Sequence, residues 1–158
     1  MGLIFEKIGT RYPQCELKIV SDIFFDCEKI EVVKKQWKPE EEVADLQSFD
    51  IGLMPLVDDP WSWGKCGLKI IQYQGVGVPV VCMPVGINRD LVEDRVNGFW
   101  ATTQEEWEEK LSILIENKAL RERMGREGRK RVLERFTIQA CAPRLLSILK
   151  KVSEKSQP

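Results

Sequence analysis

Residues 60–81 read PWSWGKCGLKIIQYQGVGVPVV, and this stretch decides the fold class that the sequence predicts. A glycine-rich turn at residues 64–67 leads into an apolar run with helical spacing, which the GVP sequence at residues 77–79 ends. The β-branched segment VVCMP at residues 80–84 is typical of a strand. We therefore expect a helix from about residue 67 to residue 76, followed directly by a strand.

The segments on either side continue the alternation of strands and helices. Residues 49–56, FDIGLMPL, form a continuous apolar run, which is typical of a strand buried on both faces of a parallel sheet. Further strands are expected at residues 16–21 and from residue 31. Helices are also expected elsewhere: one ends at Pro13, one begins at Pro39 and one begins near Asn88. A further helix follows the capping box of Thr103 and Glu106. The next carries Leu120, Met124 and Val132, and the last covers residues 140–152.

Short helices between buried strands predict the fold class and the domain organisation. The pattern favours an α/β fold, namely a Rossmann-like three-layer parallel sheet flanked by helices. The chain has 158 residues, of which 43% are hydrophobic, and this suits one domain with a substantial core. We expect that domain to cover residues 1–152 and residues 153–158, SEKSQP, to form a solvated tail.

Composition excludes several classes of function. The formal net charge of -1 argues against a globally basic protein that binds nucleic acid. The chain has no histidine, which removes the commonest general base and metal ligand together with every Ser-His or Cys-His pair. The cysteines predict reduced, mostly buried thiols rather than disulfides or a zinc site, because they are odd in number and widely spaced; they are Cys15, Cys27, Cys66, Cys82 and Cys141.

The apolar segments also bear on location. No run approaches the length of a membrane span, and the first residues, MGLIFEKIGTRYPQ, lack the apolar core of a signal peptide. We therefore expect a cytoplasmic protein and leave peripheral membrane contact open.

The glycine-rich turn is placed where parallel sheets bind ligands. It follows a strand and opens a helix, so free backbone N–H groups and the positive end of the helix dipole point there, and Lys65 adds a charge. This chemistry favours a phosphate or a pyrophosphate. The alternative is an ordinary glycine-rich connection with a solvated lysine. A Walker P-loop is excluded because it needs glycine at the position of Asp59 and Ser or Thr at that of Cys66.

Two longer stretches resemble a known family. Residues 50–101 include IQYQGVGVPVV, a PVG turn and a downstream Asn-Gly turn, and a later segment contains MGREGR-x-x-V-x-x-RF. Together, over roughly residues 45–136, they resemble the donor-binding C-terminal half of a GT-B fold glycosyltransferase of the retaining family 4 type. The resemblance implies transfer of a sugar from a nucleotide-diphosphate donor, with no metal and no further cofactor.

The resemblance also implies roles for single residues. The turn formed by Gly64, Lys65, Cys66 and Gly67 would meet the donor phosphate and sugar. Gln72 stands where the family has the glutamate that binds the ribose, and an amide can still donate to and accept from a diol. Residues 87–90, with Asn88, would line the same crevice, and residues 36–39 would lie by the nucleobase. The family motif has two glutamates, and the first of them would fall at Gly64. The contacts that this glutamate makes to the sugar would then have to come from Asp58, Asp59 or Lys65.

A larger departure from the family pattern concerns what precedes residue 1. By the resemblance, we expect residues 1–158 to lack the N-terminal acceptor domain and the first strand of the C-terminal domain. Stabilising a departing nucleotide diphosphate takes donors from both walls of a closed cleft. We therefore expect the chain alone to be inactive and an acceptor domain to be supplied by another chain.

Several other features have a purely structural explanation as an alternative to a functional one. Trp61 and Trp63 could stack on a base or sugar, or cap the loop against the sheet edge. Asp58 and Asp59 resemble a metal-binding pair but suit a turn better. The arginine-rich residues 118–135 suit an anionic partner, or a solvated helix paired with the acidic segment before it. Two alternatives to a transferase domain therefore remain, a non-catalytic nucleotide-binding module and an interaction module.

Overall fold

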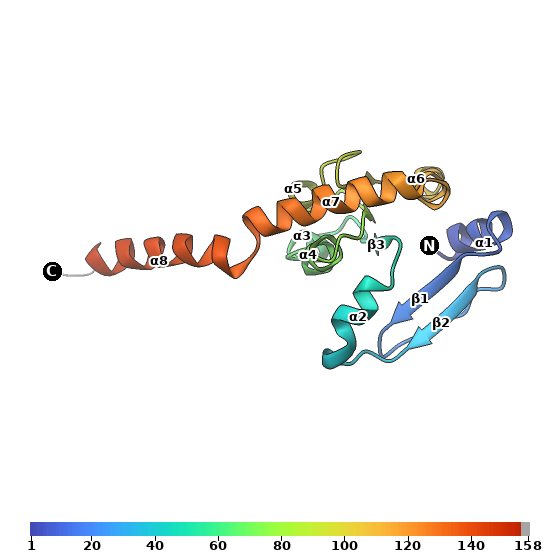
Figure 1. The fold of residues 1–158 in the computed structure, drawn as a ribbon, viewed down its shortest axis with the longest axis horizontal. Helices are drawn as coiled ribbons and strands as arrows, with labels where there is room; N and C mark the ends of the chain where they lie inside the picture. The colour runs from blue at the N-terminus through green and yellow to red at the C-terminus, as the bar shows by residue number, and fades with distance from the viewer. Residues whose placement is uncertain (156–158) are drawn as a thin grey trace.

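The computed structural model describes residues 1–155, along which helices and strands alternate (Figure 1). The elements are α1 (Gly2–Arg11), β1 (Glu16–Val20), β2 (Glu31–Lys35), the 3-10 helix η1 (Pro39–Glu41), α2 (Glu42–Gln47), β3 (Gly52–Met54), α3 (Pro60–Trp63), α4 (Leu68–Gly75), β4 (Val80–Cys82), α5 (Asn88–Leu91), β5 (Gly98–Trp100), α6 (Gln104–Glu116), α7 (Lys118–Arg135) and α8 (Ile138–Lys155). The strand pairs are parallel. The predicted α/β class, with parallel strands flanked by helices, is confirmed.

The strands form two sheets rather than one. The first contains β1 and β2, with Glu16 opposite Glu31, and the second has the order β3-β4-β5. The expected strand at residues 49–56 is shorter than predicted, because only Gly52–Met54 pairs with β4 and a bond from the Leu56 N–H to the Met54 carbonyl (3.1 Å) turns the chain away. Figure 1 shows β1 and β2 beside α1, set apart from β3.

The three-stranded sheet is covered on both faces. Val81 packs with α1 and α6 side chains such as Ile8 and Leu114, in one buried cluster. Val80 and Cys82 lie in a second cluster with Ile70 of α4. Because successive strand residues point to opposite faces, β4 contributes to both clusters. The sheet is therefore the middle of three layers.

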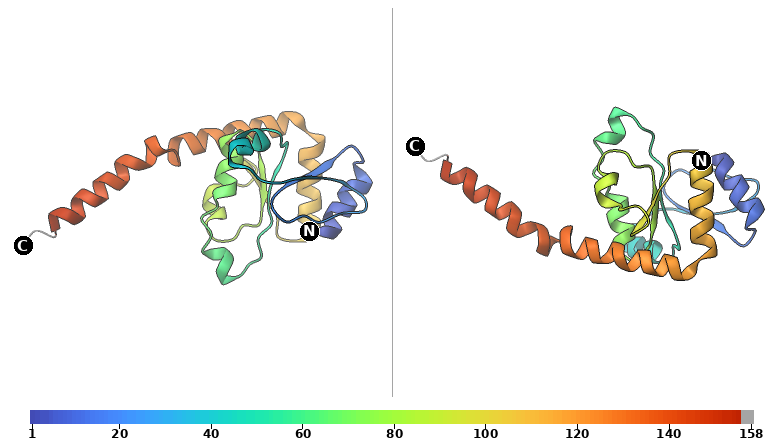
Figure 2. Two further views of the ribbon diagram at one scale, coloured as in Figure 1. Left: turned by 90° about the horizontal axis from the view of Figure 1, so that it is seen from below. Right: turned by 90° about the horizontal axis from the view of Figure 1, so that it is seen from above.

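The helices largely follow the sequence signals. Thr103 and Glu106 form the expected capping box at the start of α6. The last helix differs, since α8 runs to Lys155 and so includes residues 153–155 of the predicted tail, while residues 156–158 lie outside the described part. Glu and Lys continue a helix readily, which explains the extension. The views in Figure 2 agree that α8 projects away from the rest of the protein.

A buried carboxylate holds α2 against the two-stranded sheet. Asp45 of α2 is 4% exposed, and its Oδ1 accepts from Lys18 Nζ of β1 (2.8 Å) and Lys35 Nζ of β2 (2.7 Å). Hydrogen bonds from Lys18 and then Lys35 lower the pKa of the Asp45 carboxyl. The bonds stabilise the charged form of this carboxyl in the folded chain.

Asp45→Asn is expected to lower the melting temperature at neutral pH, by a difference that shrinks in acid. A depressed carboxyl pKa contributes stability above the unfolded-state value of about 4, and this is lost as the pH falls through the folded-state value. Melting curves of both proteins between pH 7 and pH 3 measure it. Asp26→Asn, at a side chain that is 81% exposed, is the control expected to change little. A pH-independent difference for Asp45→Asn would contradict this account.

Candidate functional site

The candidate site lies in the loops that follow β3 and β4. The first loop carries the short helix α3, whose N-cap Asp59 accepts from the Ser62 backbone N–H at 2.7 Å. This bond lowers the pKa of Asp59. Asp58 accepts from the indole N–H of Trp63, also at 2.7 Å. Both carboxylates are thus engaged in shaping the loop, as the turn-forming interpretation predicts.

Gly67 begins α4 in a conformation that suits glycine. Its φ of +67° is left-handed, and an added Cβ would lie 2.3 Å from Leu91 Cδ1. No side chain caps this end of α4. Among the described residues, we find no acceptor for the backbone N–H groups of Cys66, Gly67, Leu68 and Lys69. The end of α4 therefore offers unpaired donors together with the positive end of its dipole.

The loop after β4 packs against this helix start. Gly86 has φ of +52°, and a Cβ there would lie 3.0 Å from the Trp63 carbonyl oxygen, so the two loops touch. Asn88 is fully buried and donates to the Met83 carbonyl at 3.0 Å. Its Oδ1 has no partner in the described structure and lies 3.5 Å from where a Cβ of Gly67 would be. Asn88 thus leaves a buried acceptor beside the α4 terminus.

The structure brings together most of the predicted site residues. Gly64 ends α3, and Lys65 and Cys66 are exposed in the connection that leads to Gly67. Within residues 1–155 we find no ion pair for the Lys65 ammonium. Gly64, Lys65 and Cys66 are exposed, while Gly67 and Asn88 are buried beside each other where α4 begins. We call these five residues the loop site.

Gln72 lies elsewhere, in a second cluster further along α4. The Glu42 carboxylate of α2 accepts from the Trp37 indole (3.2 Å) and from Lys69 Nζ (3.3 Å). A hydrogen bond from Trp37 is the main cause that lowers the Glu42 pKa, and Lys69 and Gln72 contribute in the same direction. The Gln72 Oε1 is buried without a partner in the described structure. We call Trp37, Glu42, Lys69 and Gln72 the α2–α4 cluster.

Sequence reasoning did not identify Glu42. In the sequence, Glu42 is one of the acidic residues at the start of the helix that follows Pro39. A favourable interaction with the helix dipole is enough to explain an acidic residue there, so the sequence did not mark Glu42 as part of a site. Its contact with Lys69 joins positions 27 residues apart. The same contact turns the side chain of Lys69 toward α2.

The tryptophans and acidic residues of the loop show no further site. Trp61 and Trp63 are 79% and 59% exposed, which disfavours the second of the two alternatives, a hydrophobic cap on the sheet edge. In the part of the chain that the structure describes, no group of three or more acidic or cysteine side chains could hold a metal ion. The described helices include none that is long and apolar enough to cross a membrane.

Comparison with known proteins identifies the family. The family model described as glycosyl transferases group 1 matches residues 28–131, more than half of the chain. The chain belongs to the glycosyl transferases group 1 family. No curated protein matches the sequence significantly.

Solved structures agree on the fold. Sucrose-phosphate synthase from Thermosynechococcus elongatus matches with a TM-score of 0.70 and 19% identity, over 81% of this chain and 31% of that one. HepE from Anabaena, in complex with UDP and glucose, matches with a TM-score of 0.66 and 18% identity, over 78% and 32%. The C-terminal domain of LpcC, a group 1 family protein from Francisella tularensis, matches with a TM-score of 0.58 and 15% identity, over 87% and 78%.

These matches confirm the predicted resemblance. The chain is a GT-B glycosyltransferase domain, and it spans about a third of the length of the first two structures it matches. It covers most of the LpcC structure, which is a C-terminal domain by itself.

Proposed function

We propose that this chain binds the nucleotide-diphosphate sugar donor of a retaining glycosyltransferase. The observation that carries the proposal is the α4 terminus, where backbone N–H groups without an acceptor in the described structure adjoin Lys65, whose ammonium forms no ion pair within residues 1–155. Backbone donors and a lysine suit a diphosphate. The carboxyl ends of parallel strands, where this site lies, are the usual position for ligands in such sheets.

The α2–α4 cluster supports a ribose and base beside the diphosphate. At 1.5 Å per residue, Gln72 lies about 6 Å along α4 from its first residue. Gln72 with Glu42 offers the donors and acceptors that a diol requires, and Trp37, which is 42% exposed, offers a ring for stacking. The matched HepE structures contain UDP, or UDP-glucose, which is consistent with this proposal.

Glycosyl transfer itself needs a second half. Gly64 stands where the resemblance places the first glutamate, and one oxygen of Asp58 and one of Asp59 already accept a hydrogen bond within the loop. An acceptor domain on another chain would close the cleft and supply the opposing groups. The glycine in place of the first glutamate also favours the second candidate function, a nucleotide-binding module without catalysis.

One diphosphate among UDP, GDP and ADP is expected to stabilise the chain, and Lys65→Ala is expected to reduce this effect. At ten times its Kd, a ligand adds about 1.4 kcal/mol, or about 3–6 °C in melting temperature for a chain of this size. Thermal unfolding with each nucleotide at millimolar concentration measures it. Lys150→Ala is the matched control, because Lys150 is exposed on α8, which projects from the protein (Figure 1).

The outcomes separate the candidates. No shift with any nucleotide would contradict the proposal, as would equal shifts for the wild type and Lys65→Ala. If a diphosphate binds, an assay for free sugar released from the corresponding nucleotide sugar, with and without an added acceptor domain, distinguishes a transferase half from a binding module.

A further inference from the structure

The α2–α4 cluster contains one charged acceptor, the carboxylate of Glu42. Its hydrogen bonds from Trp37 Nε1 (3.2 Å) and Lys69 Nζ (3.3 Å) both end on the same oxygen, Oε1. A carboxylate has about four acceptor positions, so Oε2 keeps capacity for a further donor. The side chain of Glu42 is 27% exposed, and a ligand can therefore reach it from solvent.

The cluster keeps this carboxylate ionised. The hydrogen bond from Trp37 is the largest of the influences that lower the pKa of Glu42, and the bond from Lys69 acts in the same direction. Glu42 is therefore a negatively charged acceptor at neutral pH. The contact with Lys69 does not block it, because the Lys69 side chain is 49% exposed and exposed ion pairs contribute little.

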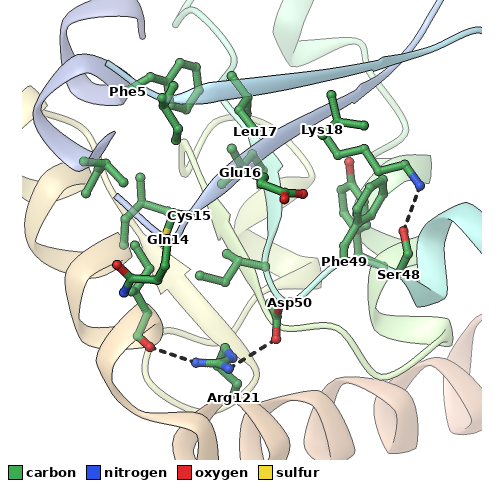
Figure 3. A pocket seen from close by; sticks show the side chains of 18 residues that line it. Phe5, Gln14, Cys15, Glu16, Leu17, Lys18, Ser48, Phe49, Asp50 and Arg121 are labelled. Atoms are coloured by element: carbon green, nitrogen blue, oxygen red, sulfur yellow. Dashed lines mark hydrogen bonds and ion pairs between the residues drawn. The ribbon is translucent and has the colours of Figure 1, made fainter. Parts of the chain in front are cut away.

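The helix that carries Glu42 is fixed in place before any ligand binds. Lys18 of β1 donates to Asp45 of α2 at 2.8 Å and to the hydroxyl of Ser48, which ends α2, at 3.0 Å; Figure 3 shows the second bond. The Glu42 carboxylate is itself oriented by the Trp37 indole. A preorganised acceptor favours specificity, because it cannot turn away from a mismatched group at low cost.

The charge of Glu42 restricts the part of a nucleotide that it can contact. A carboxylate repels a diphosphate, and the proposed diphosphate position is the start of α4, where Lys65 adds a positive charge. Glu42 instead lies beside Gln72, further along α4. The expected neighbour of Glu42 is therefore the nucleoside.

The three common purine and pyrimidine bases of nucleotide sugars differ in what they offer a carboxylate. Guanine presents two adjacent N–H donors, N1–H and the exocyclic amino group, which match the two oxygens of a carboxylate. Uracil has its N3–H between two carbonyl oxygens, and adenine has its amino group beside an unprotonated ring nitrogen, so both place a lone pair against the charge. Stacking on Trp37, which is 42% exposed, is open to every base and does not discriminate.

We propose that Glu42 selects guanine, so that the donor of this chain is a guanosine-diphosphate sugar. This inference rests on the proposed function, because it names the base of the nucleotide whose diphosphate binds at the loop site. In this arrangement Glu42 accepts from the edge of the base, and Trp37 stacks on the base and orients the carboxylate. Gln72 remains for the ribose.

A contact with the ribose is the alternative role for Glu42. Gln72 already offers an acceptor to a ribose hydroxyl, since its Oε1 has no partner in the described structure. Trp37 and Lys69 are donors only, so Glu42 is the acceptor that the α2–α4 cluster has left for a base. A contact with the ribose would strengthen the binding of every ribonucleotide alike, whereas a contact with the base would strengthen one.

Nucleotide affinities of the whole chain test the inference. Isothermal titration calorimetry with GDP, IDP, ADP and UDP gives a Kd for each. We expect GDP to bind at least about tenfold more tightly than ADP or UDP. IDP lacks the exocyclic amino group of guanine and retains one of the two donors, so its Kd should lie between these values.

Glu42→Gln is expected to weaken the binding of GDP about tenfold and to change the Kd of ADP and UDP by less than about twofold. The amide keeps one acceptor oxygen but loses the charge and the second acceptor. Glu40→Gln is the matched control, because Glu40 is exposed on η1 and should leave all four affinities unchanged. Melting curves without nucleotide check that both variants are folded.

The outcomes distinguish this inference from the proposed function. If no nucleotide binds, the proposed function fails and the inference fails with it. If nucleotides bind without a preference for GDP, the guanine selection is overturned while the diphosphate site stands. If Glu42→Gln weakens all four nucleotides equally, the selection is overturned as well, and Glu42 is assigned to the ribose.

Discussion

Gly125→Ala is expected to destabilise the protein by about 3 kcal/mol, which lowers the melting temperature by about 6–12 °C. Gly125 lies on α7 where this helix crosses the end of α4, and a Cβ would lie 1.8 Å from the Gly77 carbonyl oxygen. The obstacle is backbone, and Gly77 has φ of +85°, so this turn has little freedom to move aside. The helices would have to separate to accommodate one methyl group.

Gly75→Ala is the matched control. Gly75 is half-buried near the contact between α4 and α7, but a Cβ there would meet only Val132 Cγ1, at an ordinary 3.8 Å. Alanine favours a helix over glycine by about 1 kcal/mol, so this variant should be neutral or slightly stabilised. Urea unfolding of the wild type and both variants measures the free energies. Similar values for Gly125→Ala and the wild type would show that α7 does not pack against Gly77 as described.

This contact also explains a sequence motif physically. The MGREGR segment carried the family resemblance, but nothing in a single sequence says what its glycines contact. In the fold, Gly125 meets Gly77, and a Cβ on Gly128 would lie 2.9 Å from Gln74 Cγ. The order of strands and helices was predictable, because periodicity and capping are local signals. The partners of α7 were not, because they depend on packing between distant segments.

The division of the strands into two sheets and the surroundings of Gln72 could not be predicted from the sequence either. Both depend on contacts between segments that are distant in the chain. Residues 16–20 and 52–54 both read as strands, but strand patterns do not state which strands are neighbours. The resemblance placed Gln72 at the ribose but did not indicate that Glu42 of α2 would lie beside it. By contrast, Gly64, Lys65, Cys66 and Gly67 are consecutive, and the turn that holds them could be located from its glycines alone.

Gly67→Ala is expected to destabilise the protein by about 3 kcal/mol and also to weaken the binding of nucleotides. A left-handed conformation costs alanine about 1–2 kcal/mol. The added Cβ would lie 2.3 Å from Leu91 Cδ1 and 3.1 Å from Ile87 Cγ2, so the side chains after the Gly86 turn would have to shift. Because the same residue begins α4, any shift moves the unpaired N–H groups away from Asn88.

Gly64→Ala separates the conformational effect from simple bulk in the same loop. Gly64 has φ of -81°, a value that any residue adopts, and a Cβ there would lie 3.6 Å from the Trp61 carbonyl oxygen, an ordinary contact. Its stability should therefore change by less than about 0.5 kcal/mol. Urea unfolding gives the stabilities, and thermal shifts with the nucleotide that stabilises the wild type give the binding. If Gly67→Ala folds as stably as Gly64→Ala and responds equally to the nucleotide, the α4 terminus is not the diphosphate site. Retained stability in Gly64→Ala with a lost nucleotide response would instead move the phosphate contact to the end of α3.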